Sequence, residues 1–457
     1  MNKRIKRSLT ALWVCLFFAG GFSSAAQTSL NFPIEYYKLP NGLKVVLSQD
    51  KTAPVALVGI YYNIGFRIEP RSRTGFAHLF EHLMFQGSKN LGKMEFIKLV
   101  EDNGGVLNGS TRFDFTNYYE IIPSNTLETI LWAEADRMKG LDISQDNLTN
   151  QQGVVKNEVK VNVLNRPYGG FPWLDMPQYA NRNWYNSHNF YGDLKDIDAA
   201  TLSEASEFFK TYYAPNNAVL SICGDFDIPQ TKAWIGKYFG NIPSVKLPPK
   251  PDLSEPRQNK DQRFTKVDSL ANKPAIAVAY KMPGKNTPEY FAMGLIDQLL
   301  VQGKDSKLYQ YLVQDKGYTS VVNGGINYLG NMFDYNGPML WMADFIYDPS
   351  TSPDSIMAQF NKAVNYLNRL PESDLKLAKT KMRSSLYDLL GSNWGFGRMD
   401  LLASYALFDN NPEEVNKLVS RFDDVTPEMI KKTVKEYLRP GNRTTLIIQP
   451  ASKSNPK

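Results

Sequence analysis

Two hydrophobic periodicities along the chain predict strands and helices in separate groups. Alternating or β-branched runs predict strands at residues 43–48, 56–62 and 106–122. Apolar residues that recur every three or four positions predict five helices, at residues 75–86, 94–103, 125–138, 146–164 and 202–213. Because strands come in groups before runs of helices, the pattern predicts an α+β fold with largely antiparallel sheets packed with helices.

This pattern occurs twice along the chain. HLFEHLMFQG, which begins at His78, parallels GLIDQLLVQG, which begins at Gly294, and three other pairs of segments agree in the same order. The sequence therefore predicts two homologous α+β domains, at residues 27–245 and 263–457. The prolines and charges of residues 246–262 are typical of an exposed linker.

Residues 1–26 have the order of a secretory signal peptide. Basic residues come first, an apolar centre follows, and Ser24 and Ala26 occupy the small-residue positions before a cut at Gln27. An uncleaved membrane anchor is the alternative, but the apolar run is shorter than the roughly 20 residues of a spanning helix. We expect an exported, periplasmic protein without stable membrane insertion after cleavage.

Composition narrows the class of protein. A content of 42% hydrophobic, 12% aromatic and 21% charged residues excludes a disordered chain. The formal charge is +6, but four basic residues lie among the first seven, which leaves 48 basic against 46 acidic residues elsewhere. Nucleic-acid binding gains no support from this balance. Cys15 lies in the leader, so Cys223 would be a lone, buried thiol in the mature chain.

Two of the three histidines form a candidate metal-binding pair. His78 and His82 lie four residues apart in HLFEH, and on a helix this spacing places both imidazoles on one face. Glu81 can then act on a water molecule without being a ligand itself. The alternative is a pair of packed histidines beside an unrelated acid. In the second copy the equivalent positions predict no metal site, because they hold Gly294, Asp297 and Gln298.

Glu158 is the best candidate for a third ligand. A catalytic zinc ion commonly takes three protein ligands and keeps one position open. In VVKNEVKV a helix would place Glu158 on its apolar stripe, where ionised carboxylates are rare unless they are paired or metal-bound. A salt-bridged helix acid remains the alternative. His188 is a weaker candidate ligand, and Cys223 is an unlikely one.

The order H-x-x-E-H is that of the inverzincins, and the chain resembles half-length members of the insulinase or pitrilysin-like zinc peptidases. The resemblance includes HLFEHLMFQGS, GGVLNGSTRFDFTNYYE, VVKNEVKVNVLNRPYG, YYAPNNAVLSICGDFD and SKLYQYLV. It implies that His78, His82 and Glu158 bind Zn²⁺ and that Glu81 is the general base. It also implies a metalloendopeptidase that hydrolyses peptides or small unfolded polypeptides.

The resemblance further implies a place for the substrate. A peptide would add itself as an extra strand beside residues 106–122, with Asn108 and Gly109 near the scissile bond. The alternative interpretation of Asn108 and Gly109 is ordinary turn or bulge chemistry. Binding through the main chain predicts broad peptide specificity with a size limit.

Two departures from the family pattern bear on the site and its partner. Gln151 stands where relatives often carry a glutamate that supports the zinc ligands. The Arg and Tyr pair that the family uses in its later copy is missing, because Val313 and Ser320 occupy those places and Tyr318 fits only with a gap. We therefore expect a heterodimer with a homologous two-domain subunit that carries this pair, with a homodimer as the second choice.

Two other functions stay open at this stage. Some relatives are non-catalytic scaffold subunits of membrane complexes, although the intact H-x-x-E-H motif argues against that role. Others are peptidases that remove leader segments from precursors, and the sequence does not separate this activity from general peptide clearance.

Overall fold

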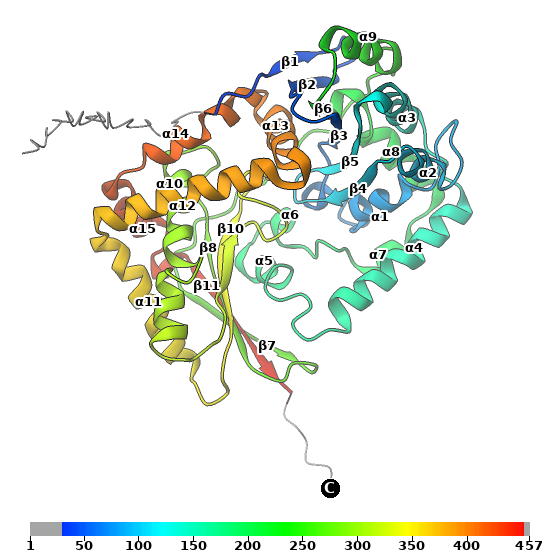
Figure 1. The fold of residues 1–457 in the computed structure, drawn as a ribbon. Coiled ribbons are helices and arrows are strands. Elements are labelled where there is room, and N and C mark those ends of the chain that lie inside the picture. Colours follow the sequence, from blue (N-terminus) through cyan, green and yellow to red (C-terminus); the bar gives the residue numbers. More distant parts are fainter. Residues whose placement is uncertain (1–29, 452–457) are drawn as a thin grey trace, which may run out of the picture.

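The computed structural model describes residues 30–451, so the expected signal peptide lies outside the described residues. The chain is a mixed α+β structure in which two sheets are packed with helices, as the sequence predicts (Figure 1). Among the described residues, no helix combines the length and the apolar character that crossing a bilayer requires.

The first sheet has six strands in the order β1-β2-β6-β3-β5-β4. Neighbours are antiparallel except β2 and β6, which are parallel. The strands are β1 (Glu35–Lys38), β2 (Lys44–Gln49), β3 (Val55–Tyr62), β4 (Val106–Thr111), β5 (Thr116–Pro123) and β6 (Ala218–Gly224). Strand β4 ends the sheet, so one side of its backbone has no neighbouring strand among the described residues.

Nine α-helices precede β7 in the described part of the chain, and five of them coincide with the predicted helices. They are α1 (Phe76–Leu83), α2 (Glu95–Asp102), α3 (Leu127–Lys139), α4 (Gln145–Val159), α5 (Asp175–Ala180), α6 (Trp184–Ser187), α7 (Leu194–Ala199), α8 (Leu202–Tyr212) and α9 (Ile228–Phe239). A π-helical turn, Lys160–Leu164, continues α4. Helix α8 begins in a capping box made by Thr201 and Glu204.

The continuous strand expected at residues 106–122 is wrong in one respect. The chain reverses after Thr111, and β4 and β5 form an antiparallel hairpin in which Asn108 lies opposite Tyr119. The apolar pattern runs through the turn because Phe113 and Phe115 are themselves buried. Because tertiary packing buries these two rings, the hydrophobic periodicity of the sequence does not predict the turn.

The second sheet repeats the order of the first. Its order is β7-β11-β8-β10-β9, with β7 and β11 parallel and the other pairs antiparallel. The strands are β7 (Gln262–Asp268), β8 (Ala275–Lys281), β9 (Asn323–Ile326), β10 (Leu340–Ile346) and β11 (Arg443–Pro450). Strand β9 thus takes the edge position that β4 takes in the first sheet.

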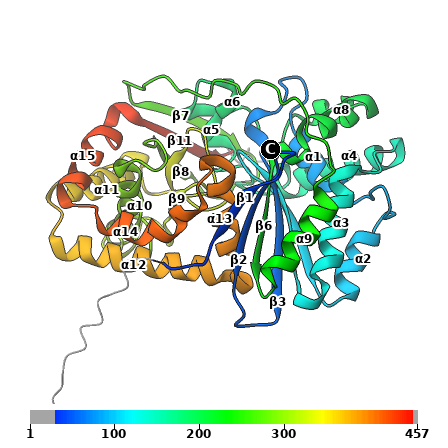
Figure 2. The ribbon, with the colours of Figure 1, turned by 90° about the horizontal axis from the view of Figure 1, so that it is seen from above.

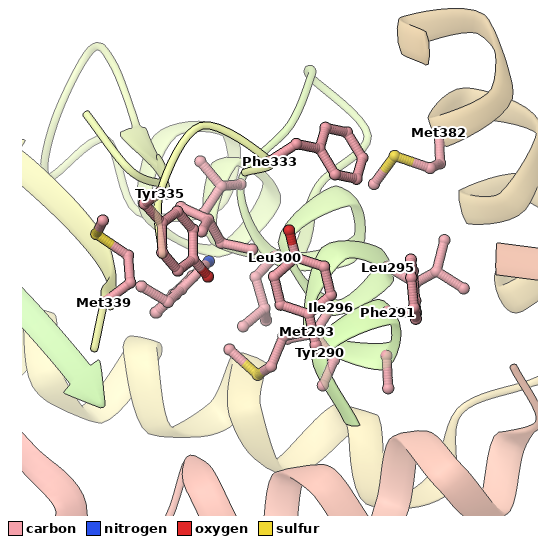
Figure 3. Close-up of a cluster of buried hydrophobic side chains, with 14 of the residues drawn as sticks. Tyr290, Phe291, Met293, Leu295, Ile296, Leu300, Phe333, Tyr335, Met339 and Met382 are labelled. Carbon is pink, nitrogen blue, oxygen red and sulfur yellow. The ribbon is translucent and has the colours of Figure 1, made fainter. Parts of the chain in front are cut away.

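Six α-helices follow β7 in the described part of the chain. They are α10 (Pro288–Leu300), α11 (Pro353–Tyr366), α12 (Glu372–Gly391), α13 (Phe396–Asp409), α14 (Leu418–Asp423) and α15 (Pro427–Tyr437). Helix α10 is buried along its whole length from Tyr290 to Leu300, and Figure 3 shows its side chains packed with Phe333, Tyr335, Met339 and Met382. This core forms around the helix that corresponds to α1 in the first half.

Helix α13 joins the two halves. It belongs to the second half by sequence, yet it packs against β2, β3 and β6 of the first sheet. Figure 2 shows α3 and α9 on one side of that sheet and α13 on the other. Consequently both faces of the first sheet are covered by helices, and β4 is one of its two edge strands.

The stretch proposed as a linker, residues 246–262, contains no helix or strand before β7 begins at Gln262. Most of its residues are exposed, but the Glu255 side chain is buried. The Glu255 carboxylate accepts hydrogen bonds from the main-chain N–H groups of Arg182 and Asn183 and pairs with Lys281 at 2.9 Å. These contacts hold the stretch against both halves.

Candidate metal centre

Helices α1 and α4 bring three potential ligands together. His78 and His82 point from one face of α1, and their Nε2 atoms lie 3.4 Å apart. Glu158, near the end of α4, places Oε1 at 3.6 Å from Nε2 of His78 and Oε2 at 3.3 Å from Nε2 of His82. Among the described residues this is the one group of three or more metal-binding side chains whose donor atoms converge, all within 4.8 Å of one another.

The spacing of these donor atoms suits a tetrahedral zinc ion. Two ligands at zinc bond lengths of about 2.0–2.1 Å and at the tetrahedral angle are separated by about 3.3 Å. The three measured separations lie close to that value. Two imidazoles and one carboxylate are also a ligand set of catalytic zinc sites, which leaves a fourth position open.

The environment keeps the donors in the protonation states that a metal needs. Burial, opposed only in part by Glu158, lowers the pKa of His78 to about 4, so its imidazole is neutral at pH 7. The hydrogen bond with His82 lowers the pKa of Glu158, so that group is an anion. A neutral imidazole and a carboxylate anion can both donate a lone pair to a cation.

Tyr191 supports Glu158 and was not foreseen from the sequence. Its hydroxyl donates a hydrogen bond to Oε1 of Glu158 at 3.1 Å, and its ring meets His78 edge-on with 5.1 Å between centroids. Burial, with the nearby Glu158, raises the pKa of Tyr191 to about 12, so the hydroxyl keeps its proton. Tyr191 has no fixed sequence spacing from His78 or Glu158, so the sequence alone does not indicate its hydrogen bond to Glu158.

Glu81 lies beside the three donors and is not one of them. Its Oε2 accepts a hydrogen bond from Oγ1 of Thr111 at 2.6 Å, so β4 fixes the orientation of this carboxylate. Burial raises the pKa of Glu81. A carboxylate with a raised pKa and one oxygen free of described protein partners can accept a proton near neutral pH.

A second carboxylate fixes the start of α1. Glu69 is fully buried and accepts hydrogen bonds from the main-chain N–H groups of Gly75 at 2.8 Å and Ala77 at 2.6 Å. These groups belong to the first turn of α1, where N–H donors lack partners within the helix. Glu69 therefore anchors the helix immediately before His78, although sequence reasoning did not single it out.

His188 takes part in this anchor and does not join the three donors. Its Nε2 lies 2.8 Å from the carbonyl oxygen of Phe66 and 3.8 Å from Glu69, and its Nδ1 lies 3.0 Å from the carbonyl oxygen of Trp184. Cys223 is buried in β6, and burial raises the pKa of its thiol to about 12. Neither residue is placed to bind a metal with His78 and His82.

The two residues expected near a scissile bond lie on opposite faces of β4. A Cβ atom on Gly109 would lie 3.3 Å from Cγ of Glu81, so this residue faces the metal centre. Asn108 is exposed on the other face, and its Oδ1 accepts a hydrogen bond from the N–H of Gly109 at 2.8 Å. Gly109 is thus beside Glu81, whereas Asn108 is not.

Gln151 is buried on α4, but it bonds to a neighbouring residue and not to the three potential metal ligands. Its Nε2 donates to Oδ1 of Asn150 at 2.8 Å. Among the described residues it makes no hydrogen bond to His78, His82 or Glu158, so the support that relatives obtain from a glutamate at this place is not reproduced here.

The second half keeps an acid at the position equivalent to Glu81 without forming a metal centre. Asp297 on α10 accepts hydrogen bonds from Nε1 of Trp341 at 2.8 Å and from Nε2 of Gln302 at 2.9 Å. Burial raises the pKa of Asp297 to about 6. Its neighbours on the helix, Gly294 and Gln298, supply no imidazole.

Comparisons with known proteins identify two family models along the chain. Residues 44–168 match the family model described as insulinase (peptidase family M16), and residues 199–382 match the model described as peptidase M16 inactive domain. The zinc protease PqqE of Helicobacter pylori is 26% identical over 98% of this chain and 99% of its own length.

Two solved structures have a similar fold. A protease from Helicobacter pylori has a TM-score of 0.84 and 25% identity, and the match covers 92% of this chain and all of that one. The periplasmic protease PqqL from Escherichia coli has a TM-score of 0.72 and 16% identity, and the match covers 92% of this chain but 48% of that one. The present fold therefore corresponds to about half of the PqqL chain.

Proposed function

Because the chain belongs to the insulinase family of peptidases, M16, we propose that it is an exported zinc metalloendopeptidase that hydrolyses peptides or small unfolded polypeptides. The convergence of His78, His82 and Glu158 beside Glu81 carries this proposal. The first three residues would hold the zinc ion. The name of the 26% identical relative, a zinc protease, supports the same metal and reaction class.

The residues of the chain have separable parts in the reaction. Zinc, when bound, would supply a Lewis acid that polarises a peptide carbonyl and makes water more acidic. The free oxygen of Glu81 would accept a proton from the attacking water and later pass it to the leaving amine. Thr111 would hold the other oxygen of Glu81 in place, and Tyr191 would hold Glu158.

The substrate would bind along β4. This strand ends its sheet, so its outer main-chain groups are available for a further strand. Gly109 would allow the peptide to approach Glu81 closely, since even a Cβ atom there would be tight against it. Recognition through the main chain accounts for a broad choice of peptide sequence.

We propose that the active form is a heterodimer in the periplasm. The missing Arg and Tyr pair and the correspondence to about half of the PqqL fold support a second, homologous two-domain subunit. A homodimer is the second choice. Export rests on the signal-like residues 1–26, which lie outside the described residues.

A non-catalytic role is the competing function. The model described as an inactive domain covers residues 199–382, which include none of His78, Glu81, His82 and Glu158. Metal content separates the two functions, because a scaffold has no need of a zinc ion.

The decisive experiment measures zinc content and hydrolysis of a quenched fluorogenic peptide mixture by the purified mature chain, alone and with a candidate partner chain. We expect one zinc ion per chain and hydrolysis that Glu81→Gln lowers by about 100-fold or more while zinc is retained. Glu101→Gln, on the exposed face of α2, is the matched control and should be fully active. A chain that takes up no zinc, or a fully active Glu81→Gln variant, would exclude the proposed reaction.

A further inference from the structure

The turn between α12 and α13 presents an unusual tryptophan. Trp394 is 74% exposed, the most exposed of the large hydrophobic side chains in the described part of the chain. Its backbone has φ 61° and ψ 21°, and Asn393 before it has φ 45° and ψ 56°. The sequence therefore places the largest apolar side chain in water on a strained turn.

Both features work against folding stability. A bulky residue in the left-handed region is strained relative to the right-handed region, and glycine would avoid that strain. Trp394 also gains little from burial in the described chain. Strain and exposure that the fold does not need indicate a role in binding.

The turn lies beside the edge strand of the first sheet. Phe396, two residues after Trp394, stacks on Tyr119 of β5 with 4.2 Å between ring centroids. Tyr119 is the direct partner of Asn108 on β4. Two residues span at most about 7 Å of chain, so the turn that carries Trp394 lies near Tyr119 and its neighbour on β4.

The turn that carries Trp394 lies on the side of the first sheet that is turned away from the metal centre. Gly109 faces Glu81, whereas Asn108 shares the face of Tyr119, against which α13 begins. Because side chains alternate along a strand, Val106 is on the same face as Asn108, and it is 59% exposed. Val106 and Trp394 are thus two exposed apolar side chains on the side of the first sheet against which α13 begins.

We propose that Trp394 is a specificity-determining residue that binds apolar side chains of a peptide added to β4. A peptide in this position directs alternate side chains to the metal centre and to the α13 face. Those on the α13 face meet Trp394 and Val106. The preferred substrates are therefore peptides with apolar residues at every second position, a choice that main-chain recognition alone does not make. The inference rests on the proposed function, because it takes β4 as the peptide-binding strand.

The test measures binding and cleavage separately. Zinc-loaded Glu81→Gln protein, with or without Trp394→Ala, is titrated into two fluorescein-labelled 12-residue peptides of roughly equal charge. One peptide alternates leucine with serine, and the other carries glutamine in place of leucine. We expect Trp394→Ala to weaken binding of the leucine peptide by about tenfold, as the loss of an aromatic contact predicts, and to leave the glutamine peptide unchanged.

Two further variants separate a binding role from a general effect on the surface. Trp394→Phe should retain most of the affinity for the leucine peptide. Leu377→Ala removes a 50% exposed apolar side chain from α12, 17 residues before Trp394, and should change nothing. Cleavage of the leucine peptide by the active chain is mapped by mass spectrometry. The wild-type chain should cut only one of the two kinds of bond, either after leucine or after serine, and Trp394→Ala should cut both kinds.

Each outcome decides the inference independently of the reaction. Hydrolysis that persists with unchanged leucine-peptide affinity in Trp394→Ala overturns the role of Trp394 while the peptidase function stands. The expected loss of affinity, with no hydrolysis by the wild-type chain either alone or with its partner chain, supports the peptide site and removes the peptidase function. A Trp394→Ala variant that loses only association with a partner chain assigns the tryptophan to an interface and overturns the inference.

Discussion

Replacing Glu69 with alanine should uncouple the metal helix from the rest of the fold. The Glu69 carboxylate is buried and accepts the main-chain N–H groups of Gly75 and Ala77 at 2.8 and 2.6 Å. Alanine leaves both donors without a partner, at about 1–3 kcal/mol for each buried group, although it also removes a carboxylate whose pKa burial raises. The net loss of unfolding free energy should be about 3 kcal/mol, and the zinc Kd should rise by 10- to 100-fold because His78 follows directly.

Thermal unfolding and zinc competition with a chelator measure the two effects. A loss of about 3 kcal/mol lowers the Tm of a unit of roughly 200 residues by about 6–12 °C. Asp227→Ala is the matched control, because Asp227 caps α9 by accepting the N–H of Gln230 at 2.9 Å, far from the metal. It should lose about 1 kcal/mol and bind zinc normally. The reasoning fails if Glu69→Ala binds zinc as tightly as the wild-type chain does.

Three further substitutions test other parts of the structure. Asp297→Asn should stabilise the fold by about 1–3 kcal/mol at pH 7 and by nothing near pH 3, as measured by urea unfolding. The raised pKa of about 6 means that the folded state holds the proton of Asp297 more tightly than the unfolded state does. The wild-type chain therefore loses stability as the pH rises from about 4 to 6. Gly109→Val should lower peptide hydrolysis by at least about tenfold with zinc content unchanged, because its Cβ would press on Glu81, and normal turnover would show that β4 does not approach the base. Arg137→Met should lose about 3–5 kcal/mol in urea unfolding, because it leaves two buried glutamates without their counterion, and a neutral effect would mean that those glutamates are protonated.

Most of the fold could be predicted from hydrophobic periodicity because each element is amphipathic in its own right. Helix α1 shows this directly, with Phe76, Leu79, Phe80 and Leu83 buried at helical spacing. The hairpin at residues 106–122 could not be predicted in this way. Phe113 and Phe115 in its turn pack against Phe190 and Tyr61, so the turn has the apolar character of a strand.

Some residues of the candidate site could likewise be predicted from the sequence, and others could not. His78, Glu81 and His82 are close in sequence, and helical geometry alone places them on α1. Glu158 is distant, and it was found through its position on an apolar helix stripe and the family resemblance. Thr111, Tyr191 and Glu69 carry no such signal, because they reach the site through tertiary hydrogen bonds. Residues that orient metal ligands are therefore the hardest part of a site to predict from sequence spacing.

The two copies of the fold explain why the same helix serves chemistry in one half and packing in the other. The acids at equivalent positions, Glu81 and Asp297, are both buried enough for their pKa values to rise. Glu81 receives one hydrogen bond and faces the open edge strand, whereas Asp297 has both oxygens engaged by Trp341 and Gln302. A carboxylate with both oxygens occupied has no lone pair directed at a reactant, and without imidazoles beside it there is no place for a cation. The chemical difference between the halves thus follows from hydrogen-bond partners and two histidines, not from a different backbone.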